Sequence, residues 1–218
     1  MLSYLSIEKL PDHIHFRKRA QAIAMLDAIL MPDWEFRRYS FNSRWGKDEM
    51  MASMRDGEGS DYYALIFRGN IIIKGFDKNS KLAEFYSRNA KIWPGIYKNA
   101  PSVFNEFKKE VAFSIDEASF CIWKENNEPW KYGEVDLKLK NELRLLEIYV
   151  KNEKFYKKWA DAYYETNIPI NIIKMIYNHE PVSEAIIKKV NSKLSINDME
   201  SDIKEIGFPV HNESGRLG

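Results

Sequence analysis

Apolar and polar residues alternate along the stretch from Glu49 to Asp77, and this alternation predicts three consecutive antiparallel strands. Successive side chains of a strand point to opposite faces, so Met50, Ala52 and Met54 share one side of the first strand. Glycine-containing breaks separate the strands and predict tight turns, because glycine adopts the positive φ that a reversal needs. The middle strand is apolar on both faces, which is typical of a strand inside a sheet.

Two further stretches extend the predicted sheet on either side. Residues 34–42 alternate well enough for an edge or second-layer strand, and residues 118–125 predict a fifth strand. Gly75, near the end of the third strand, indicates a bulge or a close backbone approach. The apolar side chains of the 34–42 strand are expected to point inward: Trp34, Phe36 or Tyr39, and Phe41.

Helical spacing of apolar residues precedes the sheet. Asp12 is placed to cap a helix and Pro32 to stop it. The connection after Asp77 is long and irregular, and a short helix from Val103 to Lys109 is expected to press Phe104 and Phe107 against the sheet. The first helix is expected to bury a single stripe: Phe16, Ala20, Ile23, Leu26 and Leu30.

The chain becomes helical from Asn152 onward, whereas residues 135–150 leave helix and strand equally open. Further helices are expected over residues 171–177, from Ser183, and over 195–206. Ser195 and Asp198 resemble a capping box for the last of these. The helix that follows Asn152 is expected to bury Phe155, Trp159, Ala162, Tyr163 and Thr166.

These elements predict an α+β fold with an antiparallel, at most mixed, sheet of about five strands. An α+β region of residues 1–150 carries the N-terminal helix and the sheet. A helical module of residues 151–210 is expected to pack on it as one compact unit, and residues 211–218 are expected to fray.

Composition narrows the function classes without choosing one. The 218 residues are 44% hydrophobic and 14% aromatic, enough for a substantial core. No apolar run is long enough to span a membrane, and the single cysteine, Cys121, has apolar neighbours; both fit a cytoplasmic protein with no membrane partner. The net charge of +1 argues against a dedicated nucleic-acid-binding protein.

Motifs for catalysis and cofactor binding are scarce, so no catalytic residue, cofactor or metal ligand is assigned. His13 and His15 do not complete a zinc site, and the chain contains no phosphate-binding glycine loop. The acidic turn at residues 56–61 lacks the glycine and glutamate positions of an EF-hand. Glu106-Phe107-Lys108 matches the E-x-K of metal-dependent nucleases, but it falls on the expected short helix, where chance explains it better.

Parts of the sequence resemble a family of uncharacterised bacterial cytosolic proteins. The resemblance rests on MMASMRDGEGSDYYALIF and IIIKGFD in the sheet, and on FYKKWADAYYE, IYNHEPVSEAII and DIKEIGFP in the helices. It implies no catalytic residues. The size and the aromatic-rich α+β make-up also resemble the immunity proteins that neutralise toxins delivered between competing bacteria.

Two hypotheses follow. The first is a non-catalytic protein that binds a protein partner, in particular an immunity-type inhibitor of a toxin domain; its oligomeric state stays open. The alternative is a metal-dependent hydrolase or nuclease-like enzyme for phosphodiester or nucleotide substrates, in which Asp56, Glu58, Asp61 and Asp77 converge from the ends of neighbouring strands. The partner-binding residues predicted under the first hypothesis are Trp45, Asp56, Glu58, Asp61, Asp77, Trp93 and Tyr97.

Overall fold

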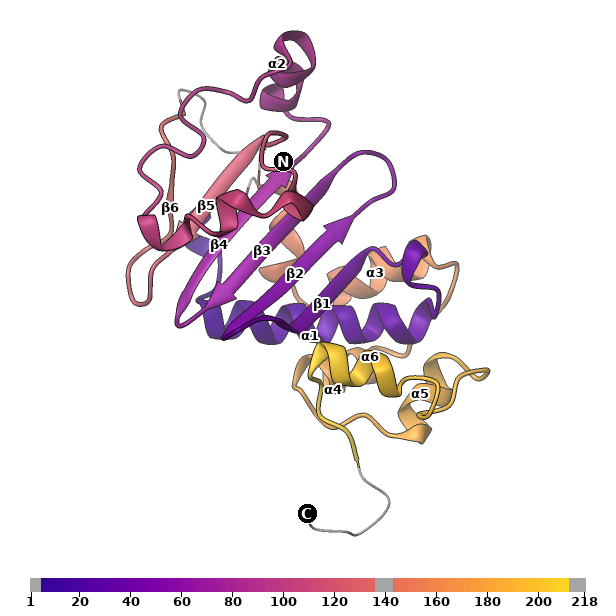
Figure 1. The fold of residues 1–218 in the computed structure, drawn as a ribbon. Helices are drawn as coiled ribbons and strands as arrows, with labels where there is room; N and C mark the ends of the chain where they lie inside the picture. Colours follow the sequence, from indigo (N-terminus) through magenta and orange to yellow (C-terminus); the bar gives the residue numbers. More distant parts are fainter. Residues whose placement is uncertain (1–4, 136–142, 212–218) are drawn as a thin grey trace.

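The computed structural model describes residues 5–135 and 143–211. It contains a six-stranded antiparallel sheet whose strands follow one another in chain order, so the expected α+β fold is confirmed with one more strand than predicted (Figure 1). The strands are β1 (Tyr39–Gly46), β2 (Glu49–Arg55), β3 (Asp61–Phe67), β4 (Asn70–Phe76), β5 (Phe120–Lys124) and β6 (Lys131–Tyr132).

The N-terminal helix α1 (His13–Leu30) lies against one face of the sheet (Figure 1). Asp12 caps it as predicted, because its carboxylate accepts the His15 N–H at 2.9 Å. The predicted buried stripe of α1 was too narrow, since every residue from Ala20 to Ile29 is buried. The sheet covers one side of α1 and the C-terminal helices cover another.

Four short helices follow the sheet: α3 (Glu153–Tyr163), α4 (Ile170–Tyr177), α5 (Glu184–Val190) and α6 (Glu200–Ile206). The predicted face of α3 was wrong, because Tyr156 and Ala160 are buried while Phe155 and Tyr163 are exposed. α6 starts five residues later than predicted; Ser195 and Asp198 do exchange hydrogen bonds, but these cap a turn ahead of the helix.

The other face of the sheet is covered by residues 90–119, here called the covering segment. Its Ile96, Phe104, Phe107 and Phe113 pack against Leu65, Ile72, Cys121 and Trp123 of the sheet. The expected helix of residues 103–109 is instead two 3-10 turns, η3 (Ser102–Phe104) and η4 (Phe107–Lys109), which bury both phenylalanines as predicted. A further turn, η5 (Val111–Phe113), follows.

Two elements between the sheet and the helices were missed or left open. Helix α2 (Lys81–Asn89) precedes the covering segment and is capped by Ser80, whose Oγ accepts the Ala83 N–H at 2.9 Å. Of the undecided residues 135–150, Arg144–Tyr149 form a 3-10 helix, η6, while residues 136–142 lie outside the described part of the chain.

The predicted strand over residues 34–42 begins only at Tyr39. Trp34–Phe36 form a 3-10 turn, η2, in which Trp34 is exposed, contrary to the prediction. Of the alternatives Phe36 and Tyr39, Tyr39 is the buried one, and Phe41 is buried as predicted. Arg37 explains the difference: its guanidinium donates to the Met31 and Pro32 carbonyls and pairs with Asp202 of α6. These bonds hold the chain out of the sheet until β1 begins.

The predicted close approach to the backbone is found at Gly75. A Cβ at this position would lie 2.3 Å from Cζ of Phe120, its partner on β5, whose ring is buried. Gly75→Ala is therefore expected to destabilise the protein by about 1–3 kcal/mol, as overpacking does in closed cores. Urea unfolding measures this. Gly46→Ala is the control, because its Cβ would meet only the carboxylate of flexible Glu49; an equal loss there would contradict the explanation.

Candidate partner-binding face

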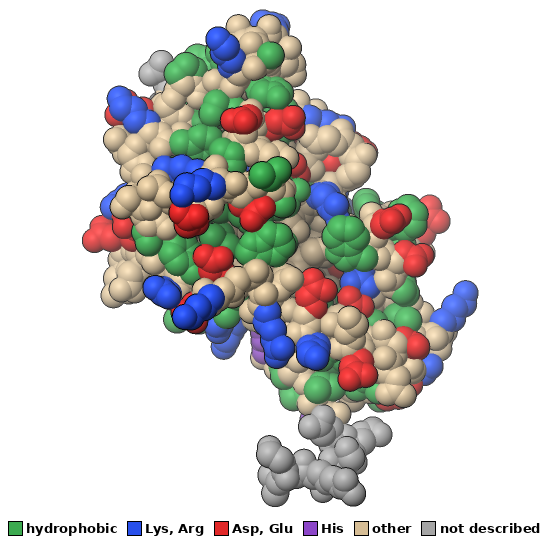
Figure 2. All heavy atoms as spheres, in the orientation of Figure 1, with side chains coloured by type: hydrophobic (Ala, Val, Ile, Leu, Met, Phe, Trp, Pro, Cys, Tyr) green, Lys and Arg blue, Asp and Glu red, His purple; other side chains and the backbone are tan. Residues whose placement is uncertain are grey.

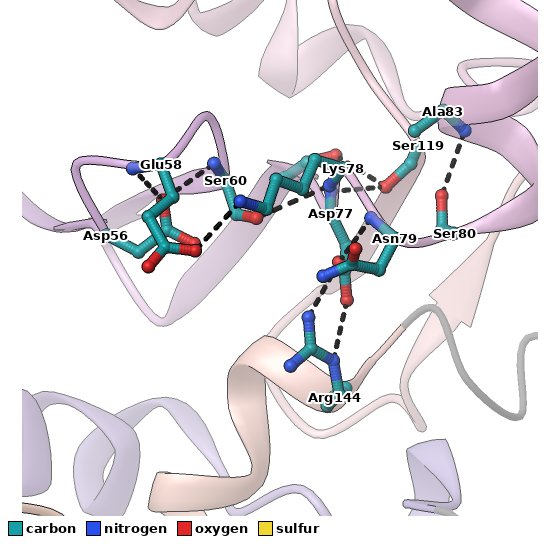
Figure 3. Close-up of polar contacts among 11 residues, drawn as sticks. Asp56, Glu58, Ser60, Asp77, Lys78, Asn79, Ser80, Ala83, Ser119 and Arg144 are labelled. Atoms are coloured by element: carbon teal, nitrogen blue, oxygen red, sulfur yellow. Dashed lines mark hydrogen bonds and ion pairs between the residues drawn. The ribbon is translucent and has the colours of Figure 1, made fainter.

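Asp56 and Glu58 lie in the β2–β3 hairpin, and Figure 3 shows them beside the loop that follows β4. The Asp56 carboxylate accepts the N–H groups of Glu58 and Ser60, both at 2.8 Å. Burial acts to raise the pKa of Asp56, but these two bonds, the Ser60 side chain and the charge of Arg38 together leave the pKa lowered. Glu58 is exposed and accepts from Lys78 at 2.8 Å. Asp56 therefore fixes the turn, while only Glu58 is presented to solvent.

Asp77 is buried directly after β4. Its carboxylate accepts two hydrogen bonds from the Arg144 guanidinium, at 3.0 and 2.8 Å, and one from the Asn79 N–H at 3.0 Å (Figure 3). Its own N–H donates to Ser119 Oγ at 2.9 Å. Asp77 thus ties the end of β4 to η6 and to the start of β5. All its carboxylate contacts serve the fold.

Asp61 pairs with a lysine that sequence reasoning missed. The Lys74 side chain is fully buried, and its Nζ donates to Asp61 Oδ1 at 3.0 Å and lies 5.6 Å from the centre of the Tyr63 ring. Burial lowers the pKa of Lys74 and raises that of Asp61, with each partner opposing the shift of the other. The available signal was a lysine inside an otherwise apolar strand, in IIIKGF.

Trp93 and Tyr97 belong to the covering segment and are both half-buried. The Trp93 ring packs edge-on against Phe85 of α2, with centroids 4.7 Å apart. The Tyr97 hydroxyl donates to the Ile115 carbonyl at 2.7 Å, and burial raises the pKa of Tyr97 well above its usual range. Tyr97 therefore joins two parts of the covering segment, and Trp93 joins the covering segment to α2.

Trp45, near the end of β1, borders an open hollow of about 210 Å³, here called the Trp45 pocket. The Trp45 ring stacks on Phe113 with centroids 5.7 Å apart, and Phe113 stacks in turn on Tyr63 at 5.2 Å. The stacked Trp45 and Phe113 rings therefore join β1 to the covering segment at the pocket. The pocket is lined by Trp45, Glu49, Leu65, Glu106, Phe107, Lys109, Glu110 and Phe113.

The turn ahead of β1 exposes two aromatic residues, of which Trp34 was predicted to point inward. Trp34 is 52% and Phe36 62% exposed. The Arg55 guanidinium lies over the Trp34 ring, 4.3 Å from its centre. The only sequence signal for this exposure was Pro32-Asp33, which breaks the chain just before the aromatic residues.

Both aromatic groups belong to the same face of the sheet. Arg55 alternates with Met51 on β2, so their side chains share a face, and Met51 and Trp45 pack against the same cluster as the covering segment. The covering segment lies mainly over β3 to β5 (Figure 1), and it reaches β1 and β2 at Trp45 and Met51. Figure 2 shows hydrophobic side chains reaching the surface among acidic and basic ones on this side. We call Trp34, Phe36, Arg55 and the Trp45 pocket the partner face; its two ends lie a strand length apart, roughly 25 Å.

Residues 5–135 and 143–211 contain no candidate metal site and no candidate membrane span. No three His, Cys, Asp or Glu side chains there are grouped so that they could hold a metal ion. None of the helices described is long and apolar enough to cross a bilayer.

Comparisons with known proteins gave no match. No family model, no curated protein and no solved structure resembles the chain above the significance threshold. The resemblances suggested by the sequence therefore stay predictions, and function must be argued from the geometry.

Proposed function

We propose that the protein is a non-catalytic binding protein and that its partner is another protein, held at the partner face. The observation that carries this proposal is the pair of tryptophan groups at the two ends of strands β1 and β2: Trp34 under Arg55, and Trp45 at its pocket. The few residues that dominate the binding energy of protein interfaces are enriched in tryptophan, tyrosine and arginine. The exposed Trp34 ring with the half-buried Arg55 over it is therefore a typical anchor for a partner.

The immunity-type inhibitor is the specific form of this proposal. It adds one requirement: the partner is a toxin domain whose activity falls when this protein binds. The aromatic-rich α+β make-up motivates it. The contact residues predicted from the sequence are revised according to whether their side chains are free to meet a partner. Trp45 and Glu58 remain accessible, whereas Asp56, Asp61 and Asp77 are engaged within the fold.

Position-specific crosslinking tests the proposal. A photoreactive phenylalanine placed at Phe36 is expected to crosslink a single protein in the native host, at near-equal stoichiometry. The same probe at Tyr132, on the opposite edge strand β6, is the control, because Tyr132 is 47% exposed and lies outside the partner face. Equal capture at both positions, or none at Phe36, would contradict the proposed face.

Once the partner is purified, the effect of single substitutions on its binding affinity can be measured. Trp34→Ala is expected to weaken binding about 30-fold, corresponding to about 2 kcal/mol for an interface anchor. Tyr132→Ala should leave the affinity unchanged, and isothermal titration measures both. If the partner is a toxin, its activity should fall in proportion to the fraction of toxin bound. An unchanged toxin activity at saturation would contradict the proposed inhibitor but not the proposed binding function.

The positions of the carboxylates do not support the alternative hypothesis of a metal-dependent hydrolase or nuclease-like enzyme. Asp56, Asp61 and Asp77 each bind different protein groups, namely backbone N–H groups, Lys74 and Arg144. A metal-dependent hydrolase needs such carboxylates to converge on one point.

A further inference from the structure

We propose that the Trp45 pocket receives an arginine side chain of the protein partner. This inference deepens the proposed function and rests on it. It starts from the size of the hollow: about 210 Å³ is less than the roughly 300–1,000 Å³ of sites for drug-sized ligands and cofactors. A hollow of this size suits one side chain.

The charges around the pocket select a cation. Three glutamates line it, Glu49, Glu106 and Glu110, against one lysine. Lys109 is already paired with Glu106 at 2.7 Å. Glu110 accepts the Ala112 N–H at 3.0 Å, and Glu49 has no basic partner within 4 Å among the described residues. The rim therefore carries carboxylate charge that a basic guest can neutralise.

The aromatic wall favours arginine over lysine. The Trp45 ring forms one side of the hollow, and a guanidinium is a planar cation that stacks on such a ring. Its forked N–H groups bind carboxylates in pairs, while its three methylene groups suit the apolar base formed by Leu65 and Phe107. Arg55 on Trp34 shows this type of stack within the same face.

The Glu49 carboxylate lies against the backbone of the β1–β2 turn at Gly46. A Cβ on Gly46 would lie 2.4 Å from Glu49 Oε2, so only glycine leaves room for the carboxylate at this place. Gly46→Ala therefore moves the Glu49 charge without removing it. This variant separates the position of the charge from its presence.

The test uses the full-length protein labelled with 5-fluorotryptophan and followed by fluorine NMR. The chain has 6 tryptophans, and Trp45→Phe assigns the Trp45 signal by its loss. The probe is N-acetyl-arginine-methylamide, compared with the lysine and the uncharged citrulline analogues. The arginine probe is expected to shift the Trp45 signal alone, and the citrulline analogue is expected to shift none.

Variants then test the carboxylates. Glu49→Gln and Glu106→Gln are each expected to weaken the arginine probe about two- to fivefold, the usual range for a partly exposed charge pair, and Gly46→Ala should have a similar effect. Glu8→Gln, an exposed glutamate in the 3-10 turn Ile7–Lys9, is the control and should change nothing. Unchanged NMR line widths of the other tryptophans show that the variants remain folded.

The outcomes separate this inference from the proposed function. Three results would contradict the proposal that the Trp45 pocket binds a cationic side chain: equal binding of citrulline, equal affinity in all the glutamine variants, or shifts spread over several tryptophans. Equal binding of lysine would overturn the choice of arginine. The proposed function is tested separately, by the Phe36 crosslink and the Trp34→Ala titration, which do not depend on the Trp45 pocket.

Discussion

Replacing Asp61 with alanine is expected to destabilise the protein by about 3 kcal/mol at pH 7, because it leaves the fully buried Lys74 ammonium without its carboxylate. The loss should shrink as the pH rises toward 10. Without Asp61 the folded-state pKa of Lys74 falls further below its unfolded value, so above that pKa the unfolded chain binds the extra proton and stability rises with pH. Urea unfolding at pH 7 and pH 9.5 measures both effects.

A second variant shows whether the charge itself is responsible. Adding Lys74→Met to the Asp61→Ala background replaces the buried ammonium with an apolar side chain of similar length. Most of the stability should return at pH 7, and the pH dependence of the loss should disappear. A double variant no more stable than Asp61→Ala would show that lost packing, not the uncompensated charge, sets the cost.

Asp27 of α1 is expected to make the protein more stable at pH 4 than at pH 7. Its fully buried carboxylate accepts the Tyr39 N–H at 2.9 Å and the hydroxyls of Tyr156 and Tyr164 at 2.9 and 2.8 Å. Burial raises the pKa of Asp27 to about 6, although these bonds and the nearby Arg38 backbone oppose it. Between the unfolded value of 3.8 and about 6, the folded state keeps a proton that the unfolded state has lost.

The contribution of Asp27 is fully present below pH 3.8 and is lost as the pH rises through 6, which amounts to about 3 kcal/mol. The measurement is the difference in unfolding free energy between the parent and Asp27→Asn across this range, since the asparagine does not titrate. Asp116→Asn, at an exposed position, is the control. A difference that stays constant from pH 4 to pH 7 would contradict the raised pKa.

The strands were predictable because their pairing is local. β2, β3 and β4 are joined by short turns, so alternation and glycine were enough to place them, and the register pairs Ala52 with Ala64 and Ala64 with Ile73 in the apolar layer. The cap of α1 was local in the same way. Ser80 at the start of α2 was an equally local signal, which the irregular text around it obscured.

Contacts between distant residues explain what could not be predicted. α3 turns Tyr156 inward because its hydroxyl reaches Asp27, 129 residues earlier in the chain. Likewise, Arg37 holds Trp34 outside the sheet through Asp202. In the candidate site, the sequence placed carboxylates at the strand ends, but it did not show that Lys74 and Arg144 are their partners.

The burial of α1 on two sides has a consequence for synthesis of the chain. The first four strands are consecutive hairpins and can pair on α1 as soon as they leave the ribosome, since their contacts are close in sequence. The side of α1 that faces α4, α5 and α6 stays uncovered until residues 170–206 are made. A ribosome that stalls before residue 170 would therefore release a chain with an intact sheet and an open apolar helix, a substrate for chaperones and proteases.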